Sequence, residues 1–392
     1  MTKMVLAQHA SRSLDLVGAS HEVGALAFEH SAAAERNRRL DADVVSAIVD
    51  AGFARHFVPR ACGGTGGTFV ELTEAVSIVG RGCASSAWCA SLFANLSRMA
   101  GFLPVEGYQR IWADGPDAIV VGSLIPAGKA EWVGDGWRLS GTWPYISGVD
   151  FSDWALLCGN TVSSSGPEPL VFAVPRACLQ VEDSWFSVGM AATGSNTVTV
   201  DDVAVPVSMA FKRSDLFAGR ALGSSEPCHN VPLLAANGLS FVTPMLGSAQ
   251  GALSHWSAYV GAKIRNYAEK PVGPAPNRSR YELTLARCSG EIDAAELLLH
   301  RASQLADRGS ATTTADTAQN CRDTALAVEF LTAAVNRLFI SAGTNAQTTA
   351  NPLQRSWRDV NSASTHIALS FDTAAATYAE TALDPAAAPA GR

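Results

Sequence analysis

The sequence has little of what binds metals, nucleic acids or membranes. Its eight cysteines and eight histidines are dispersed, with no Cys-x-x-Cys pair and no His-Glu-x-x-His segment, so neither a metal site nor a disulfide framework is expected. Only 17% of the residues are charged, the net charge is −7, and Lys and Arg do not cluster, which argues against nucleic acid as a partner. No apolar run approaches the roughly 20 residues of a membrane span, and the N-terminus lacks a secretory pattern. We therefore expect a cytoplasmic protein.

A dinucleotide-binding fingerprint is also missing. No Gly-x-Gly-x-x-Gly segment follows a strand and opens a helix, and the glycine-rich stretch 63–67 lacks the third glycine in register. The sequence therefore shows no NAD(P)H site. Since no metal is expected either, any redox chemistry depends on an organic cofactor.

Five regions with different patterns follow one another, and 47% of all residues are hydrophobic. Residues 1–117 have the apolar spacing of helices, whereas 118–210 contain short runs rich in Val, Ile, Trp and Phe, typical of a β domain. Residues 211–243 are a long connection and a candidate lid. Residues 244–383 have the amphipathic pattern of a helical bundle, and 384–392 are expected to be a disordered tail.

Within residues 244–383 we expect three or four long amphipathic helices, each with one apolar face. Their approximate bounds are 244–268, 279–308, 314–341 and 356–382.

This order of regions resembles that of the acyl-CoA dehydrogenase superfamily from about residue 31 to residue 380. The Pro-x-x-x-Gly-Gly turn at 59–64 and the segment 189–202, which closes the β domain, carry the resemblance. It implies a mainly α fold with a central β domain: an N-terminal helical domain, a middle β-barrel or sandwich, and a C-terminal four-helix bundle.

Three segments resemble the flavin-dependent monooxygenase branch of this superfamily. They are Cys-Ala-Ser-Ser-Ala-Trp at 83–88, Gly-Thr-Trp-Pro-Tyr-Ile-Ser-Gly at 141–148, and Asn-Pro-Leu-Gln-Arg-Ser-Trp-Arg-Asp at 351–359, which is the most specific. A dehydrogenase needs a carboxylate base over the flavin. The two places where the family carries it hold no Asp or Glu here: 351–354 is Asn-Pro-Leu-Gln, and the predicted helical stretch 247–263 has no acidic residue.

The resemblance implies the oxygenase component of a two-component (class D) monooxygenase. Such a protein receives diffusible reduced FAD or FMN from a separate NAD(P)H-dependent flavin reductase. It forms a C4a-hydroperoxyflavin with O2 and hydroxylates a small aromatic or polycyclic substrate, and the resemblance also implies a homotetramer. An amine N-oxygenase of the same fold, an acyl-CoA dehydrogenase and a non-enzymatic binding module are the alternatives.

Two residues are the catalytic candidates. By resemblance Ser147 places a hydroxyl beside flavin N5, and His366, on the last helix, acts as general base or as hydrogen-bond partner of the peroxide. An unperturbed His pKa near 6.5 suits proton transfer near neutrality. From the residues alone, Ser147 is a strand-end turn and His366 an ordinary helical histidine.

Further candidates concern the cofactor. By resemblance Trp143 stacks on the flavin ring and Ser123 contacts it from the neighbouring strand; without the resemblance, Trp143 is a core residue. Lys263 and Arg265 are candidates for the flavin phosphate, with a solvated helix face as the alternative. Arg358 could reach flavin from a neighbouring subunit or form a structural ion pair.

The substrate candidates rest on a departure from the family. Phenol-hydroxylating members usually carry a second His about eight residues beyond the Ala-Trp pair, where this chain has Phe-Ala-Asn-Leu at 93–96. This favours an indole or polycyclic aromatic ring, an amine, or a substrate whose hydroxyl is held otherwise, by Asn95 or by His229. Leu96 is a further candidate substrate contact. His229, in the candidate lid, is another substrate-contact candidate, with a solvated loop histidine as the alternative.

Overall fold

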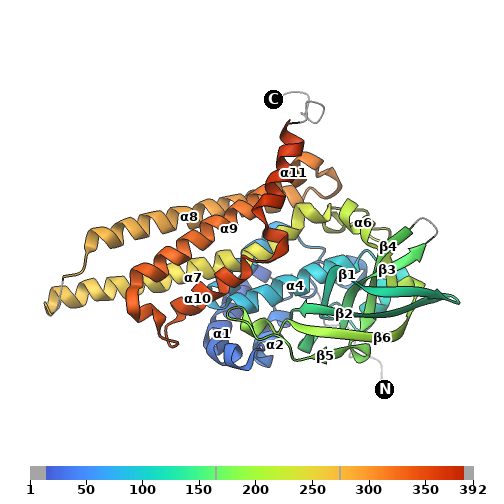
Figure 1. Ribbon diagram of the computed structural model, residues 1–392, viewed down its shortest axis with the longest axis horizontal. Helices are drawn as coiled ribbons and strands as arrows, with labels where there is room; N and C mark the ends of the chain where they lie inside the picture. Colours follow the sequence, from blue (N-terminus) through green and yellow to red (C-terminus); the bar gives the residue numbers. More distant parts are fainter. Residues whose placement is uncertain (1–14, 164–165, 273–274, 384–392) are drawn as a thin grey trace, which may run out of the picture.

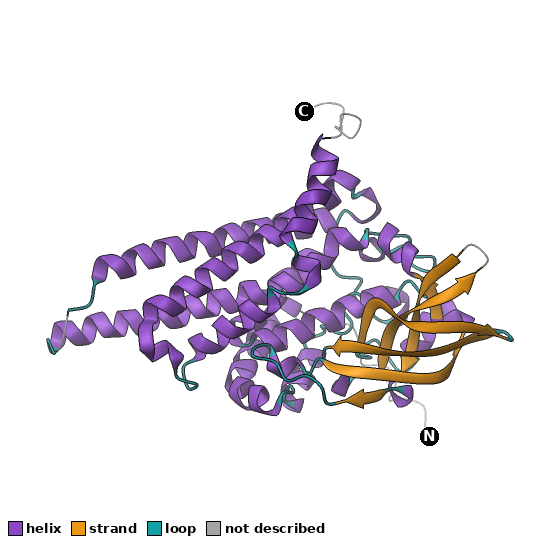
Figure 2. Ribbon diagram, viewed as in Figure 1, coloured by secondary structure: helices purple, strands orange, loops and turns teal. Residues whose placement is uncertain are grey.

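A computed structural model describes residues 15–163, 166–272 and 275–383 of the chain. The predicted tail at 384–392 lies outside these ranges. Helices fill one end and the middle of the molecule, and a single sheet forms the other end (Figure 2). The mainly α fold with a central β domain is therefore confirmed.

The N-terminal region is helical because its segments begin at good capping residues. The side chains of Asp15, Asp41 and Thr68 accept backbone N–H groups at the starts of the first three α-helices. The helices are α1 (Leu16–Asn37), α2 (Ala42–Asp50), α3 (Phe69–Gly82), α4 (Ala84–Ala100) and α5 (Val105–Ile111). Every residue of α4 except Leu92 is buried, so this helix is the centre of the molecule.

The β domain is one seven-stranded sheet in the order β5-β6-β2-β1-β3-β4-β7. Only the β1–β3 pair is parallel. The hairpin predicted around 133–137 joins β1 to β2 through Gly134, whose φ of 67° suits glycine. The strands are β1 (Val120–Val133), β2 (Gly136–Ile146), β3 (Trp154–Ser163), β4 (Gly166–Pro175), β5 (Gln180–Glu182), β6 (Asn196–Pro206) and β7 (Ala210–Lys212).

The C-terminal region is a bundle of long helices. In Figure 1, α7, α8 and α9 run side by side away from the sheet, and α10 lies along them. The elements are α6 (Arg213–Ala218), which precedes the bundle, and then α7 (Leu233–Glu269), α8 (Arg278–Ala306), α9 (Thr314–Ala342), α10 (Pro352–Ala363) and α11 (Phe371–Leu383).

The first bundle helix begins earlier than predicted. Helix α7 starts at Leu233 and continues through Pro244, where a helix start was expected. Pro244 has no N–H for the carbonyl oxygen of Ser240, and the hydroxyl of Ser91 on α4 donates to that oxygen at 2.8 Å instead. The connection predicted over 211–243 is correspondingly shorter and contains β7 and α6.

The last predicted helix is also different. Residues 356–382 are not one helix, because α10 ends at Ala363 and α11 begins at Phe371. A 3₁₀ turn, Ile367–Leu369, separates them, and His366 is its N-cap. His366 therefore lies in a break between helices, where the chain can turn its side chain toward α4 and α7.

One described helical stretch, Thr314–Gln347, which consists of α9 and the 3₁₀ helix that follows it, is by length and apolar composition alone able to cross a membrane. This differs from the sequence analysis, which found no apolar segment of that length. The helix packs against α7, α8 and α11. Burial of one face within a bundle accounts for the same apolar composition.

Candidate active site

Ser147 lies just beyond the end of β2, where the chain turns sharply. Gly148 has a φ of 71°, and its N–H donates to the carbonyl oxygen of Thr193 at 2.8 Å. This contact joins the end of β2 to the turn that precedes β6. The Ser147 side chain is buried, and its hydroxyl oxygen is 2.8 Å from that of Ser195.

Trp88 connects Ser147 to His366. The indole N–H of Trp88, on α4, donates to Ser147 Oγ at 3.2 Å, and its ring meets the His366 imidazole edge-on with the ring centroids 5.7 Å apart. Phe241 on α7 stacks on the same imidazole with the centroids 3.8 Å apart. The two predicted catalytic residues thus lie at one aromatic cluster between the β domain and the bundle.

The protonation of His366 follows from its surroundings. Burial lowers the pKa of the His366 imidazole from 6.5 to about 4, so the ring is neutral near pH 7. Its Nδ1 accepts the N–H of Ala368 at 3.2 Å, which places the single ring proton on Nε2. Among the described residues Nε2 has no hydrogen-bond partner. In this conformation His366 is a hydrogen-bond donor rather than a base.

Trp143 does not lie at this site, and its predicted stacking on flavin is wrong for this structure. The side chain is 0% exposed, and its indole N–H donates to the carbonyl oxygen of Cys158 at 2.8 Å. The ring fills the space above Gly128 and Gly141, where an added Cβ would approach it to 2.3 and 2.7 Å. Trp143 is therefore a core residue of the β domain.

Ser123 is half-buried on β1, and its hydroxyl accepts the N–H of Ile125 at 3.3 Å. The exposed aromatic side chain beside the site is Tyr145, which is 67% exposed and meets Trp185 edge-on at 5.9 Å between centroids. Contact of Ser123 with flavin stays a prediction.

His229 is buried within its own chain rather than solvated. It is fully buried, its Nδ1 is 2.6 Å from Ser224 Oγ, and its Nε2 is 2.8 Å from the carbonyl oxygen of Phe57. Because the Phe57 oxygen only accepts, Nε2 carries the proton and Nδ1 accepts from Ser224. Both ring nitrogens have partners within the chain, so the alternative of a solvated loop histidine is wrong, and contact of His229 with a substrate stays a prediction.

Asn95 and Leu96 are buried on α4, the helix that carries Trp88. Asn95 lies two helical turns beyond Trp88, on the same side of α4. Its amide nitrogen donates to the carbonyl oxygen of Ser91 at 2.9 Å. The predicted substrate contacts of both residues stay predictions.

Arg358 is engaged within its own chain. It forms an ion pair with Glu35 and donates to the carbonyl oxygen of Val188 at 2.7 Å and to Gln354 Oε1 at 2.8 Å. The neighbouring Asp359 is buried and accepts the N–H of Met190 at 2.6 Å. These contacts, with the Glu35 ion pair, fix α10 against the segment before β6 and against α1. Contact of Arg358 with the flavin of a neighbouring subunit stays a prediction.

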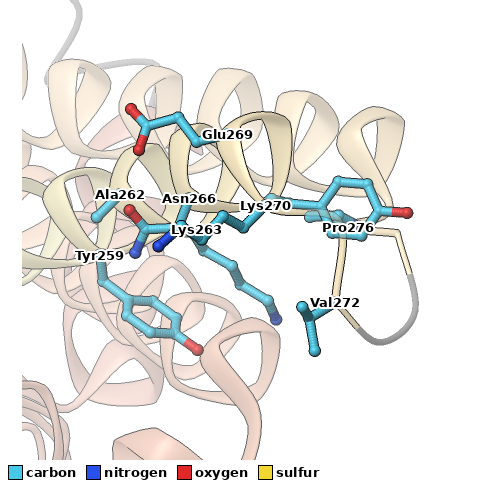
Figure 3. A pocket seen from close by; sticks show the side chains of 9 residues that line it. Tyr259, Ala262, Lys263, Asn266, Glu269, Lys270, Val272 and Pro276 are labelled. Atoms are coloured by element: carbon cyan, nitrogen blue, oxygen red, sulfur yellow. The ribbon is translucent and has the colours of Figure 1, made fainter.

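Lys263 and Arg265 are exposed near the C-terminal end of α7. Lys263 lines a cavity of about 700 Å³ at the tip of the bundle, together with Asn266 and Lys270 (Figure 3). Its ammonium donates to the Tyr281 hydroxyl at 3.0 Å. This tip and the sheet lie at opposite ends of the molecule (Figure 1), so these cations are far from Ser147 of the same chain.

The sequence analysis did not single out three residues of this site: Thr193, Ser195 and Phe241. Thr193 and Ser195 lie within the segment 189–202, whose resemblance was noted only as a fold marker. Phe241 falls in the stretch that was taken for a connection. Small hydroxyls in a Thr-Gly-Ser turn carry no signal of their own, because such residues are common in turns.

The residues present suit a reduced flavin better than a thioester dehydrogenation. Ser147 offers a small buried hydroxyl, and Trp88 contacts both this hydroxyl and the ring of neutral His366. Among the described residues, no Asp or Glu side chain hydrogen-bonds to Ser147, Trp88 or His366. No group of three or more His, Cys, Asp or Glu side chains in the described ranges is placed to hold a metal.

Comparison with known proteins identifies the family of the chain. Residues 239–371 match the acyl-CoA dehydrogenase C-terminal domain model. The chain is 32% identical to the oxygenase component of FADH2-dependent resorcinol hydroxylase from Rhizobium sp. (strain MTP-10005), over 91% of each chain. The chain belongs to the flavin-dependent monooxygenase branch of the acyl-CoA dehydrogenase superfamily.

Solved structures support the same assignment over almost the whole monooxygenase. The 3-HSA hydroxylase from Rhodococcus sp. RHA1 superposes with a TM-score of 0.88 at 25% identity, covering 94% of this chain and 96% of the other. XiaF from Streptomyces sp., in complex with FADH2 and glycerol, gives a TM-score of 0.83 at 29% identity, covering 94% and 96%. The protein is thus an enzyme, the oxygenase component of a two-component system, which implies a separate flavin reductase.

Proposed function

We propose that this oxygenase component binds reduced flavin with N5 against Ser147 and hydroxylates a small aromatic or polycyclic substrate placed near His366. The observation that carries the proposal is the joint placement of Ser147 and neutral His366 around Trp88. Bound reduced flavin supplies the activation of O2 and the transfer of one oxygen atom. The chain itself supplies orientation, hydrogen bonds and the exclusion of water.

We propose reduced FAD as the first flavin to test. The Rhizobium relative is named FADH2-dependent, and the XiaF structure contains FADH2. Lys263 and Arg265 lie far from Ser147 of the same subunit, so these two cations do not reach the phosphates of a flavin held at that Ser147. In a homotetramer, these cations of a neighbouring subunit would reach the flavin phosphates.

His366 acts as a donor in this proposal. Its neutral imidazole presents the Nε2 proton to the substrate oxygen or to the oxygen that is transferred, without first losing a proton. Phe241 and Trp88 hold the ring on two sides, so its orientation is fixed before the substrate binds.

The test is product formation from labelled oxygen. Protein and reduced FAD are mixed without oxygen, then exposed to ¹⁸O₂ with resorcinol, indole and a polycyclic phenol as substrates. We expect one labelled oxygen atom in a hydroxylated product of at least one substrate. In His366→Gln the yield falls, and hydrogen peroxide replaces the product because the substrate is no longer oriented.

Two outcomes would contradict the proposal. Oxygen uptake equal to that of free reduced flavin, with no labelled product, would exclude monooxygenation of these substrates. Oxidation of an amine that persists in His366→Ala would favour the N-oxygenase alternative, because an amine nucleophile needs no hydroxyl orientation. Light scattering of the purified protein tests the tetramer, and a monomer would remove the role proposed for Lys263.

A further inference from the structure

Three buried hydroxyl groups, beginning with that of Ser147, form a chain that ends on a carbonyl oxygen. Ser147 Oγ is 2.8 Å from Ser195 Oγ, which is 2.7 Å from Thr193 Oγ1. Thr193 Oγ1 donates to the carbonyl oxygen of Met190 at 2.8 Å. Oxygen atoms this close are joined by a hydrogen bond, so each of the three contacts requires one proton.

The number of protons fixes the direction of the chain. Each hydroxyl carries one proton and the Met190 carbonyl oxygen carries none, so three protons serve three contacts. Thr193 donates to Met190, Ser195 must therefore donate to Thr193, and Ser147 must donate to Ser195. The reverse direction at any contact would leave two buried oxygen atoms facing each other without a proton, which is unfavourable.

Trp88 supports the same direction from the other side. Its indole nitrogen can only donate, and it lies 3.2 Å from Ser147 Oγ, which therefore accepts. Ser147 donates its proton to Ser195, and one of the two lone pairs of Ser147 Oγ accepts the indole N–H of Trp88. Toward a bound ligand, Ser147 therefore has one lone pair and no proton to offer.

We infer that the chain from Ser147 through Ser195 to Thr193 makes the site select reduced over oxidised flavin. The inference rests on the proposed function, which places flavin N5 against Ser147. In reduced flavin N5 carries a hydrogen, which Ser147 accepts. In oxidised flavin N5 has only a lone pair, which would face the lone pair of Ser147.

This selection suits a cofactor that diffuses between two proteins. The oxygenase must bind reduced flavin in the presence of the oxidised form and release the oxidised form after each turnover. Because Ser147 can only accept at N5, it favours both the binding of reduced flavin and the release of oxidised flavin, with no movement of the protein. Ser195 and Thr193 are then positioning residues, because they act through Ser147 rather than on the flavin.

The test compares the affinities of the two flavin forms. The Kd of oxidised FAD is measured by fluorescence quenching, and the Kd of reduced FAD by anaerobic ultrafiltration. Ser195→Ala frees the proton of Ser147, and Thr193→Val frees the proton of Ser195, so either change lets Ser147 donate to oxidised N5. Matched controls are Ser152→Ala and Thr161→Val.

The controls are close in kind to the test residues. Ser152 is 6% exposed and Ser195 5%, while Thr161 and Thr193 are each 3% exposed. Ser152 and Thr161 each donate to a backbone carbonyl oxygen at 2.8 Å, as Thr193 does. Neither control is part of the chain to Ser147, so each reports the loss of a buried hydroxyl alone.

The wild-type protein is expected to bind reduced FAD more tightly than oxidised FAD. In Ser195→Ala and Thr193→Val the Kd of oxidised FAD divided by the Kd of reduced FAD falls roughly three- to tenfold, as expected for one hydrogen bond. The fall comes mainly from tighter binding of oxidised FAD. A tenfold fall lowers the midpoint potential of the bound flavin by about 30 mV. Both controls keep the wild-type ratio.

The failures of the two proposals can be distinguished. If both variants bind flavin with the wild-type ratio, or if wild-type protein shows no preference, the inference is wrong while the proposed function stands. If the wild-type protein binds neither form, the proposed function is wrong as well. The two variants are independent, so one that does not fold leaves the other as the test.

Discussion

A methyl group added at residue 148 is expected to damage both stability and flavin binding. Gly148 has a φ of 71°, a conformation that costs an L-residue roughly 1–2 kcal/mol. An added Cβ would also lie 2.7 Å from Cε1 and 2.9 Å from Cζ of the buried Phe93 ring. Overpacking of this kind costs about 1–3 kcal/mol. We therefore expect the free energy of unfolding of Gly148→Ala to be about 2–5 kcal/mol lower than that of the wild type.

The hairpin turn provides a matched control for the backbone part of this cost. Gly134 has a φ of 67°, and an added Cβ would meet nothing within 4 Å. The free energy of unfolding of Gly134→Ala should therefore fall by the backbone cost alone. The difference in unfolding free energy between the two variants, about 1–3 kcal/mol, measures the contact with Phe93.

The assay is urea unfolding of both variants, with reduced-FAD affinity measured in parallel. Because Gly148 follows Ser147 and its N–H holds Thr193 at 2.8 Å, only Gly148→Ala should weaken flavin binding. Equal stability and equal affinity of the two variants would refute the argument that Phe93 leaves no room for a side chain at residue 148.

Three further predictions concern buried polar groups. Ser91→Ala leaves the Ser240 carbonyl oxygen without its donor beside Pro244 and should destabilise the protein by about 1–3 kcal/mol in urea unfolding; no loss would show that water replaces the hydroxyl. Burial lowers the pKa of His229 from 6.5 to about 4, so its contribution to stability is present above pH 6.5 and is lost as the pH falls toward 4. The Tm difference between wild type and His229→Asn should therefore narrow from pH 7 to pH 4.5; a constant difference would contradict this. Burial raises the pKa of Asp359 from 3.8 to about 6, so its contribution is present below pH 4 and is lost as the pH rises through 6. Asp359→Asn, which still accepts the Met190 N–H, should therefore gain Tm relative to wild type from pH 4 to pH 7, and a relative loss would contradict it.

Much of the fold could be predicted because local patterns determined it. The bounds expected at 279–308 and 314–341 lie within a few residues of α8 and α9, since amphipathic periodicity and the Thr313–Asp316 capping box are local signals. The start of α7 could not be predicted. It depends on the Ser91 hydroxyl, which replaces the hydrogen bond lost at Pro244 and comes from a distant segment.

Some residues of the candidate site could be proposed from local motifs, whereas others depend on contacts between distant segments. Ser147 and His366 were found through motif resemblance, and the structure places them around one tryptophan. Trp143 was misplaced because the alternation of a strand does not say which face is the interior. That face is set by Gly128 and Gly141, which make room for the ring. The roles of Thr193 and Ser195 depend on hydrogen bonds that exist only in the folded turn.

The central claim, that Ser147 and His366 flank one flavin site for oxygen activation, is tested most directly by rapid mixing. Protein loaded with reduced FAD is mixed with oxygenated buffer, and the visible absorbance is followed until the flavin is oxidised. We predict that a spectrally distinct species precedes oxidised flavin in the wild type and decays faster in Ser147→Ala. Reoxidation with the time course of free reduced FAD, in wild type and variant alike, would contradict the account.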